Sequence, residues 1–371
     1  MRTVWIVGLA AVLVLGLTAL GVERHFTSTA YIETSLNTAL ASGKGVNRIK
    51  IGSSHFSLLG GTFSARDLEF VPDTTLIARR IKDGKPVRTR NSIIISSLRI
   101  RGIRVWPLLH RKVIVNSITL DGAKFDVATV RKAGPKPPPH PNAKPATLPH
   151  ASFQSLGMPV HINMIRLTNS IVTYSEVARD GSRPGTIRFS DMNTKISNVT
   201  NDPTLMTAAT PCTIHVSTLL NEAGRLDATF GYDLLSPKLN MTCRGTVSRM
   251  NATPLNELLE NLNGIKITSG VVDSTRFDFK IDGDDVARGT VEVLYHDLGI
   301  QMEDKVTLEQ DLMARFKSFV NDKAKMHDRN PGDDGRLATV ASIARERAPQ
   351  TPLIKFLWES LREGILTTLG V

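Results

Sequence analysis

One strand-turn unit recurs along this chain, and it constrains the fold more than any other feature. In each copy two apolar residues alternate with other residues, a mostly polar pair follows, and the alternation then resumes. The clearest copy starts at Val113 and returns 47 residues later, where Asn163 takes the place of Asn116. Side chains two apart on a strand share a face of a sheet. The three best copies therefore predict one apolar face, built from Ile93, Ile95, Leu98, Ile100, Val113, Val115, Ile118, Leu120, Val160, Ile162, Ile165 and Leu167.

The pair in each unit shifts the alternation by one residue, which would turn the second half of the unit to the opposite face. We therefore expect a bulge or crossing at Ser96-Ser97, Asn116-Ser117 and Asn163-Met164, so that both halves face inward. Repetition of the unit predicts a mostly β protein with an elongated, repeat-built sheet. The alternative is an ordinary β-sandwich whose strands resemble one another.

The N-terminal segment predicts a membrane anchor. Residues 4–22 contain no charged side chain, and as a helix they would span about 28 Å, close to the hydrocarbon thickness of a bilayer. Trp5 would lie at the interface, and Leu9, Leu13 and Leu17 would face lipid. Arg2 precedes the segment, so we expect the N-terminus in the cytoplasm and the bulk across the membrane. The alternative is a cleaved signal peptide.

Positive charge is concentrated in one part of the chain. The net charge is +11, and residues 79–112 hold eleven Lys or Arg and one acid. Arg99, Arg101 and Arg104 alternate with apolar residues, which predicts the solvated face of a strand. Contact of these three with anionic lipid headgroups is the alternative. We do not expect nucleic-acid binding, because no nucleic-acid motif accompanies the cluster.

The sequence predicts three regions. They are an anchor at 1–24, a β region at 25–303 with a Pro-rich insertion at 131–159, and a helical region at 304–371. Helices are expected at 31–41, 308–325 and 351–369. The last of these is amphipathic and would pack on the chain's own sheet, lie on a membrane or bind a protein partner.

The residue chemistry argues against an enzyme. The chain contains no G-x-S-x-G, H-E-x-x-H, P-loop or C-x-x-C motif, so we expect no catalytic residue, metal or cofactor. Cys212 and Cys243 would lie on the first and third strands of a meander, about 9.6 Å apart. That separation exceeds what a disulfide tolerates, so the prediction is two buried free thiols.

The order of parts resembles the AsmA-like family of bacterial envelope proteins, which includes TamB-like and YhdP-like relatives. The resemblance covers roughly residues 1–303. It rests on the anchor, the helix at 31–41, Ile49-x-Ile51-Gly52, Ala65-Arg66-Asp67-Leu68, the segment 245–264, Ile267-x-Ser269-Gly270 and Tyr295-x-Asp297-Leu298.

This resemblance implies a sheet curled into an apolar groove and a single-pass protein of the bacterial inner membrane with its bulk in the periplasm. It implies lipid handling or transport and a role in envelope biogenesis, with the inner membrane and phospholipid as partners. The alternatives are a periplasmic scaffold that binds a protein partner without lipid, through 351–369 for example, and a tethered hydrolase with a composite site. We expect aspartate at Ile118 or Ile165 to disturb lipid binding more than folding.

Overall fold

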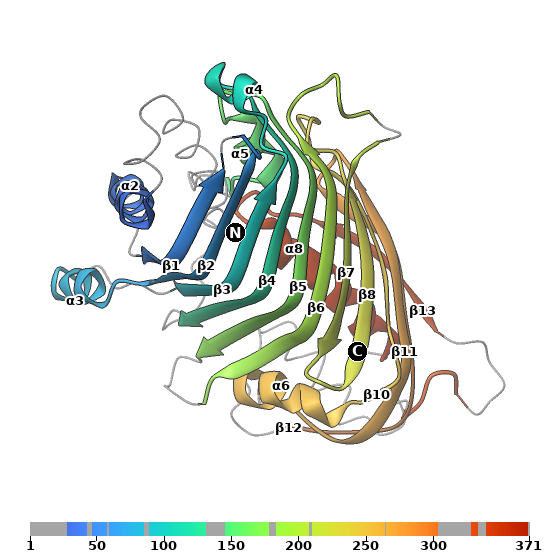
Figure 1. Cartoon of the computed structure of the whole chain (residues 1–371). Helices are drawn as coiled ribbons and strands as arrows, with labels where there is room; N and C mark the ends of the chain where they lie inside the picture. The colour runs from blue at the N-terminus through green and yellow to red at the C-terminus, as the bar shows by residue number, and fades with distance from the viewer. Residues whose placement is uncertain are drawn as a thin grey trace.

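The computed structural model describes residues 28–42, 47–57, 59–84, 89–130, 145–177, 183–207, 210–263, 265–302, 328–332 and 339–369. They form a mostly β chain with one large sheet, curled and not closed (Figure 1). This confirms the predicted fold class at that level and excludes the two-sheet sandwich. The predicted anchor, with Trp5, Leu9, Leu13 and Leu17, lies outside the described residues, as does the helix predicted at 308–325.

The sheet has thirteen strands. They are β1 (Asn47–Ser57), β2 (Thr62–Pro72), β3 (Thr89–Arg101), β4 (Val113–Val130), β5 (Val160–Val177), β6 (Gly185–Thr200), β7 (Cys212–Leu220), β8 (Gly224–Tyr232), β9 (Asn240–Val247), β10 (Met250–Asn251), β11 (Ile265–Asp282), β12 (Val286–Met302) and β13 (Val340–Glu346). The helices are α2 (Thr29–Ser42), α3 (Thr74–Lys82), α4 (Val105–Leu109), α5 (Pro149–Gln154), the 3₁₀ turn η1 (Thr253–Leu255), α6 (Asn256–Asn263) and α8 (Leu353–Thr368).

Strand order in space follows strand order in sequence, with β1 at one end and β13 at the other, except that the short β10 is off this path and pairs only with β11. Neighbours are antiparallel except β4 and β5, which are parallel. In that parallel pair Val113 faces Val160 and Ile118 faces Ile165, so the 47-residue offset of the sequence repeat is the register of the ladder. The repeat therefore stacks on its own copy, which places equivalent side chains side by side.

A row of strand irregularities crosses β2 to β6. Asp67, Gly122, Asn169 and Asp191 have φ between 48° and 63°, and on β3 Ser96 lies opposite Gly122, where the ladder is interrupted. Each irregularity shifts the alternation by one residue, as bulges do, and so keeps apolar side chains inward on both sides of the row. The bulge predicted at Ser96-Ser97 belongs to this row.

The other two predicted irregularities lie nearer the start of β4 and β5. The ladder skips Asn116 and Asn163, and Asn163 Nδ2 donates to Asn116 Oδ1 at 3.3 Å. Val115 and Ile118 are nevertheless both buried. The two halves of the unit therefore face the same side of the sheet, as the repeat interpretation required.

Two helices satisfy backbone groups at strand edges. On α2 the side chain of Asn37 accepts from Ile49 N and donates to Ile49 O, both at 2.8 Å. On α6 Asn256 makes the same pair of bonds with Ile267, both at 2.7 Å. Unpaired strand edges invite unwanted pairing, and here one amide side chain occupies each site.

The regions predicted at 131–159 and 304–371 need correction. The first contains α5, whose Phe153 and His150 are buried, so this part of the predicted insertion packs into the core. The second contains β13, which pairs with β12 from Val286 to Glu292, so it is not wholly helical. A period-two pattern of only seven residues was too short to stand out there. None of the described helices has the length and hydropathy required to span a bilayer.

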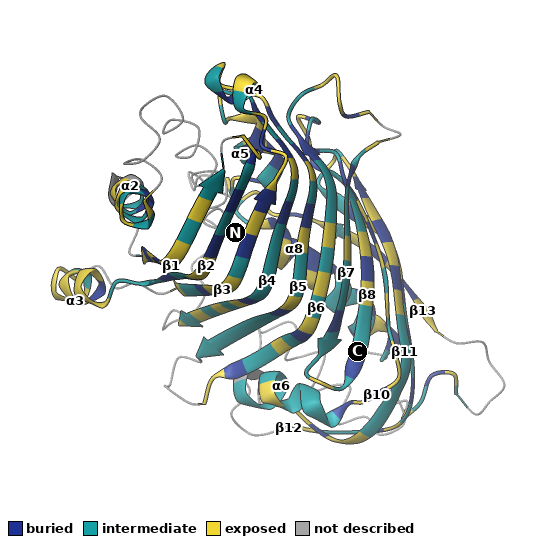
Figure 2. Cartoon of the chain, viewed as in Figure 1, coloured by how far each residue is buried: buried dark blue, intermediate teal, exposed yellow. Residues whose placement is uncertain are grey.

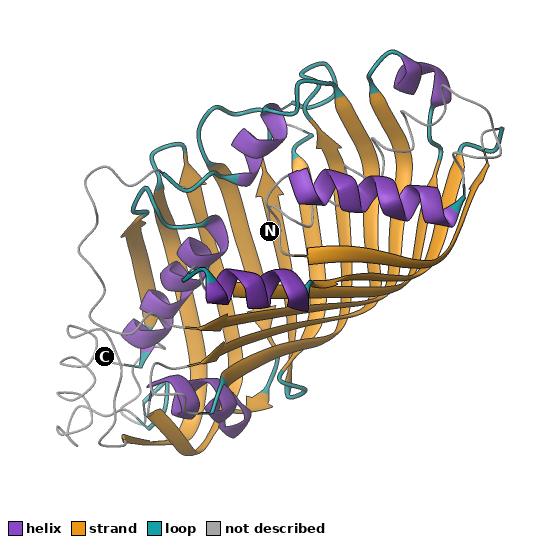
Figure 3. Cartoon of the chain, turned by 90° about the vertical axis from the view of Figure 1, so that its left-hand side faces the viewer, coloured by secondary structure: helices purple, strands orange, loops and turns teal. Residues whose placement is uncertain are grey.

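One contiguous apolar cluster joins the sheet and its helices. It extends from Ile32 on α2, across the inner face of the strands, to Phe356 on α8. Figure 2 shows the alternation of buried and exposed residues along the strands, and Figure 3 shows the curl of the sheet and the helices beside it. The outer face is mostly polar and exposed.

Candidate functional site: the apolar inner face

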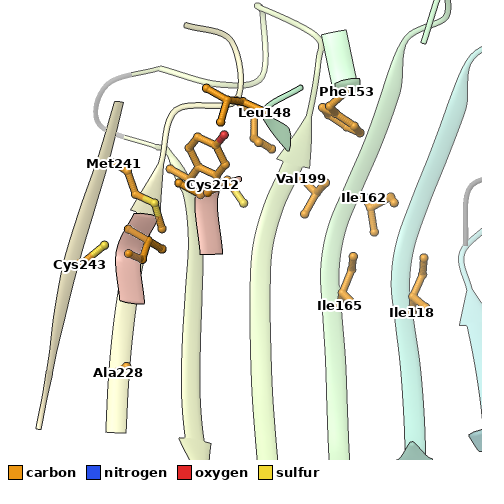
Figure 4. Close-up of a cluster of buried hydrophobic side chains, with 14 of the residues drawn as sticks. Ile118, Leu148, Phe153, Ile162, Ile165, Val199, Cys212, Ala228, Met241 and Cys243 are labelled. Atoms are coloured by element: carbon orange, nitrogen blue, oxygen red, sulfur yellow. The ribbon is translucent and has the colours of Figure 1, made fainter. Parts of the chain in front are cut away.

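All twelve residues predicted for the apolar face lie in this one cluster. Ile95, Leu120 and Leu167 are partly buried members, and the other nine are buried. Register explains why they meet: Leu98 lies opposite Leu120, which lies opposite Leu167. Figure 4 shows Ile118, Ile162 and Ile165 on adjacent strands within the cluster. The sequence thus located the inner face correctly, whereas a ligand on it stays a prediction.

Burial on this face changes along the strands. At the start of β4 and β5 the inner residues are almost inaccessible, for example Val113 and Val160 at 1% and 0% exposure, and next to the row of irregularities Leu120 and Leu167 are partly buried. Beyond the row, on β4 to β6, six apolar inner side chains are half-buried, and we call this set the accessible rows: Phe125, Val127, Val172, Tyr174, Ile187 and Phe189. A hydrophobic ligand would find its contact surface here.

The candidate lining taken from the sequence did not include the accessible rows. Their signal was present, because the alternation of β4 continues through Phe125 and Val127. Burial, however, depends on which helices cover the face, and the pattern of one strand carries no such information. Ile118 and Ile165 are only 8% and 9% exposed, so a charge there would report on stability more than on ligand binding.

The far end of the inner face is covered by α8. Phe356 is fully buried, and Leu353 and Leu357 lie beside it in the cluster. A Cβ at Gly364 would meet Val291 Cγ2 at 2.5 Å, which means that helix and sheet pack closely there. Arg345 on β13 also binds Glu359 and Glu363, both at 3.0 Å. The sequence left three possibilities for this helix, and in the structure it packs on the chain's own sheet.

The two cysteines are free and buried, as predicted. Both lie on the inner face, Cys212 opposite Tyr232 and Cys243 opposite Phe230, so β8 separates their strands. Burial raises the pKa of Cys212 to about 12 and also raises that of Cys243. These thiols are therefore protonated and unreactive at neutral pH, and they pack as small apolar side chains (Figure 4).

A buried polar pair lies between α5 and β8. His150 is almost inaccessible, and its Nδ1 lies 2.8 Å from the hydroxyl of Tyr232, which also accepts from His150 N at 3.2 Å. Burial lowers the pKa of His150. The pair fixes α5 on the sheet without a buried charge.

The outer face carries the basic residues named from the sequence. Arg99 and Arg101 lie on β3 and are exposed, which agrees with a solvated strand face. Arg104 is also exposed, but it directly precedes α4 and is not on a strand. Contact of the three with lipid headgroups stays a prediction. Further along this face a shallow hollow of about 740 Å³ crosses β5 to β9 and β11. Two rows of outward-facing side chains line the hollow, one on each side of a row that faces inward. The outward-facing residues include Arg166, Lys195 and Arg244. We do not treat it as the functional site, because its side chains are solvated and it is open.

Within the described ranges no group of three or more His, Cys, Asp or Glu could hold a metal ion. Comparisons with protein-family models and with curated proteins found no match. The resemblance to AsmA-like proteins therefore stays a prediction.

Proposed function

We propose that this chain is a non-enzymatic, inner-membrane-anchored periplasmic protein that holds acyl chains on its inner face and takes part in lipid handling for the cell envelope. The observation that carries the proposal is the gradient of burial. An apolar face that is sealed at one end and half-accessible at the other offers a lipid tail a site that water solvates poorly. The resemblance to AsmA-like proteins supports the same function.

The accessible rows have the chemistry that such a site needs. Phe125, Val172 and Phe189 lie opposite one another on three adjacent strands, and Val127, Tyr174 and Ile187 form the next row. Burying apolar surface stabilises a complex by about 25 cal/mol per Å². No charged inner side chain interrupts these two rows, and Glu176, bound at 2.9 Å by the Tyr174 hydroxyl, lies beyond them.

Photo-crosslinking tests the proposal. Benzoylphenylalanine is introduced at Phe125, on the inner face, or at Lys124, the neighbouring exposed position. The full chain is irradiated in cells, purified and analysed by mass spectrometry. We expect a phospholipid adduct at position 125 and none at 124, and Val127→Asp should reduce the adduct while thermal unfolding changes little. Equal adducts at both positions, or none at 125, would contradict lipid binding on this face.

A second candidate function is a scaffold that binds a protein partner without lipid. The coverage of β12 and β13 by α8 favours it, since a fully covered face leaves no room for acyl chains. Trp358 and Ile354 on α8 remain exposed and would be the contact points of a partner at 351–369. In this case the lipid adduct at position 125 would be absent, and benzoylphenylalanine in place of Ile354 would crosslink to a protein.

A further inference from the structure

One tip of the molecule presents exposed apolar side chains within a basic surface. We call it the α4 tip; it consists of residues 59–61, between β1 and β2, and residues 101–112, which include α4 (Figure 1). Leu59 is fully exposed and Trp106 is 72% exposed, whereas Ile103 and Leu108 are buried in the core. The helix is thus anchored through its inner side chains and turns Trp106 to solvent.

Local contacts hold this arrangement in place. Ile103 N donates to Gly61 O at 2.8 Å, which ties the β1–β2 turn to the start of α4. A surface hollow of about 660 Å³ is lined by Leu59 from the turn and by Arg104 and Val105 from the helix end. The Trp106 ring lies 4.9 Å from that of His110. The two exposed apolar residues therefore belong to one ordered surface.

The unpaired charge around the tip is positive. Residues 99–119 contain five Lys or Arg and no acid. Lys112 is neutralised by Asp202 at 3.0 Å, but Arg101, Arg104 and Arg111 are exposed and form no ion pair with any residue that the structure describes. An exposed Trp and Leu surrounded by unpaired Arg matches the interface of an anionic bilayer, where Trp lies at headgroup level and Arg contacts phosphate.

We propose that the α4 tip docks on a bilayer surface that contains anionic lipid, with Leu59 and Trp106 entering the interface and Arg101, Arg104 and Arg111 contacting headgroups. A nucleic acid would pair with the arginines but leave Leu59 in water, so the bilayer is the better occupant. The proposal is independent of acyl chains on the inner face, because it rests only on the tip.

A fluorescent reporter tests the contact. Leu59→Cys is labelled with a nitrobenzoxadiazole dye, which the buried Cys212 and Cys243 do not take up, in the full chain assembled with phospholipid nanodiscs. We expect blue-shifted emission and quenching by doxyl lipids in nanodiscs with about 30% phosphatidylglycerol, an anionic lipid, with loss of both at high salt. The same dye at Val340→Cys, an exposed apolar position on β13, should respond to neither.

Matched charge removal makes the test specific. Arg101→Gln with Arg104→Gln should weaken reporter binding to anionic lipid, about five-fold for each charge removed. Arg166→Gln with Lys195→Gln, which removes the same charge elsewhere on the outer face, should not. Trp106→Ser should also abolish quenching. A Leu59 reporter that ignores anionic lipid, or that responds to an oligonucleotide instead, would overturn the proposal. The adduct at position 125 is measured separately and is unaffected by either result.

Discussion

At the residue scale, the bend of the sheet depends on a few backbone positions with left-handed φ. Gly122 supplies this conformation without a Cβ penalty, whereas Asp67, Asn169 and Asp191 are the residue types that tolerate it best after glycine. On the outer face Thr168 and Asn169 hydrogen-bond to Asp121 at 2.6 and 2.9 Å, and these bonds lower the pKa of Asp121. Hydrogen bonds between polar side chains thus stabilise the row of irregularities on the outer face, while apolar side chains pack on the inner face.

Gly102→Ala should destabilise the protein more than Gly84→Ala. Both glycines have nearly the same φ, 69° and 67°, but a Cβ at Gly102 would lie 2.5 Å from Asn116 Cβ, whereas one at Gly84 meets nothing within 4 Å. We expect a loss of about 1 kcal/mol from backbone strain at Gly84 and about 2–4 kcal/mol at Gly102. Chemical denaturation measures both, and equal losses would show that the contact with Asn116 relaxes freely.

The protein should lose stability in mild acid through His150. Burial lowers the pKa of this residue below 6.5 in the folded state, so the unfolded chain binds more protons once the pH falls below that value. The contribution of neutral His150 is complete above about pH 6.5 and is lost as the pH falls toward the folded pKa. Melting temperatures at pH 7.5 and 5.5 should differ less in His150→Asn than in the wild type, and His110→Asn, at an exposed site, should behave as wild type.

At the element scale, a helix followed by a strand pair occurs twice with the same internal contacts. In both α2–β1–β2 and α6–β11–β12, an asparagine on the helix hydrogen-bonds to the backbone N–H and C=O of an isoleucine in the first strand. The second strand contains an Asp-Leu pair in which the aspartate, Asp67 or Asp297, has a left-handed φ. The sequence segments that resemble AsmA-like proteins include parts of both copies. They gave no indication of the role of the asparagines, because a hydrogen bond to a strand edge leaves no periodic pattern in the sequence.

Asn37→Ala should expose the edge of β1. The variant loses two hydrogen bonds and leaves the N–H and C=O of Ile49 without these partners, which costs about 1–3 kcal/mol. Hydrogen exchange at Ile49 should accelerate, and the protein should aggregate more readily through the free edge. Thr38→Ala is the control, because Thr38 is exposed on the same helix and its hydroxyl donates to Thr34 O. Unchanged exchange at Ile49 would mean that the edge finds another partner.

At the scale of the whole molecule, the sequence predicted the inner face and a single repeat-built sheet because both follow from local alternation and from the repeat. It did not predict β13 or the burial of α5, because the first pattern is short and the second depends on a contact between residues 82 positions apart. Each strand contacts mainly its chain neighbours, so a perturbation at one end of the sheet should stay there.

Phe356→Asp tests this expectation. The change places a carboxylate in the fully buried contact of α8 with the sheet, at a cost of several kcal/mol. Hydrogen exchange should accelerate in β12 and β13 and stay slow in β2 to β4. Trp358→Asp, on the exposed side of the same helix, should change neither region. Loss of protection in every strand would show that the sheet unfolds as one cooperative unit.

The row of irregularities from Asp67 to Asp191 has a consequence for how such a chain can grow. Because the row runs across the strands, along the direction in which strands are added, a duplicated unit inserted beside its parent brings its own irregularity to the correct position in the row. Gly122 and Asn169, 47 residues apart on the paired copies β4 and β5, already stand in this relation. Gene duplication can therefore lengthen the molecule while its cross-section stays constant.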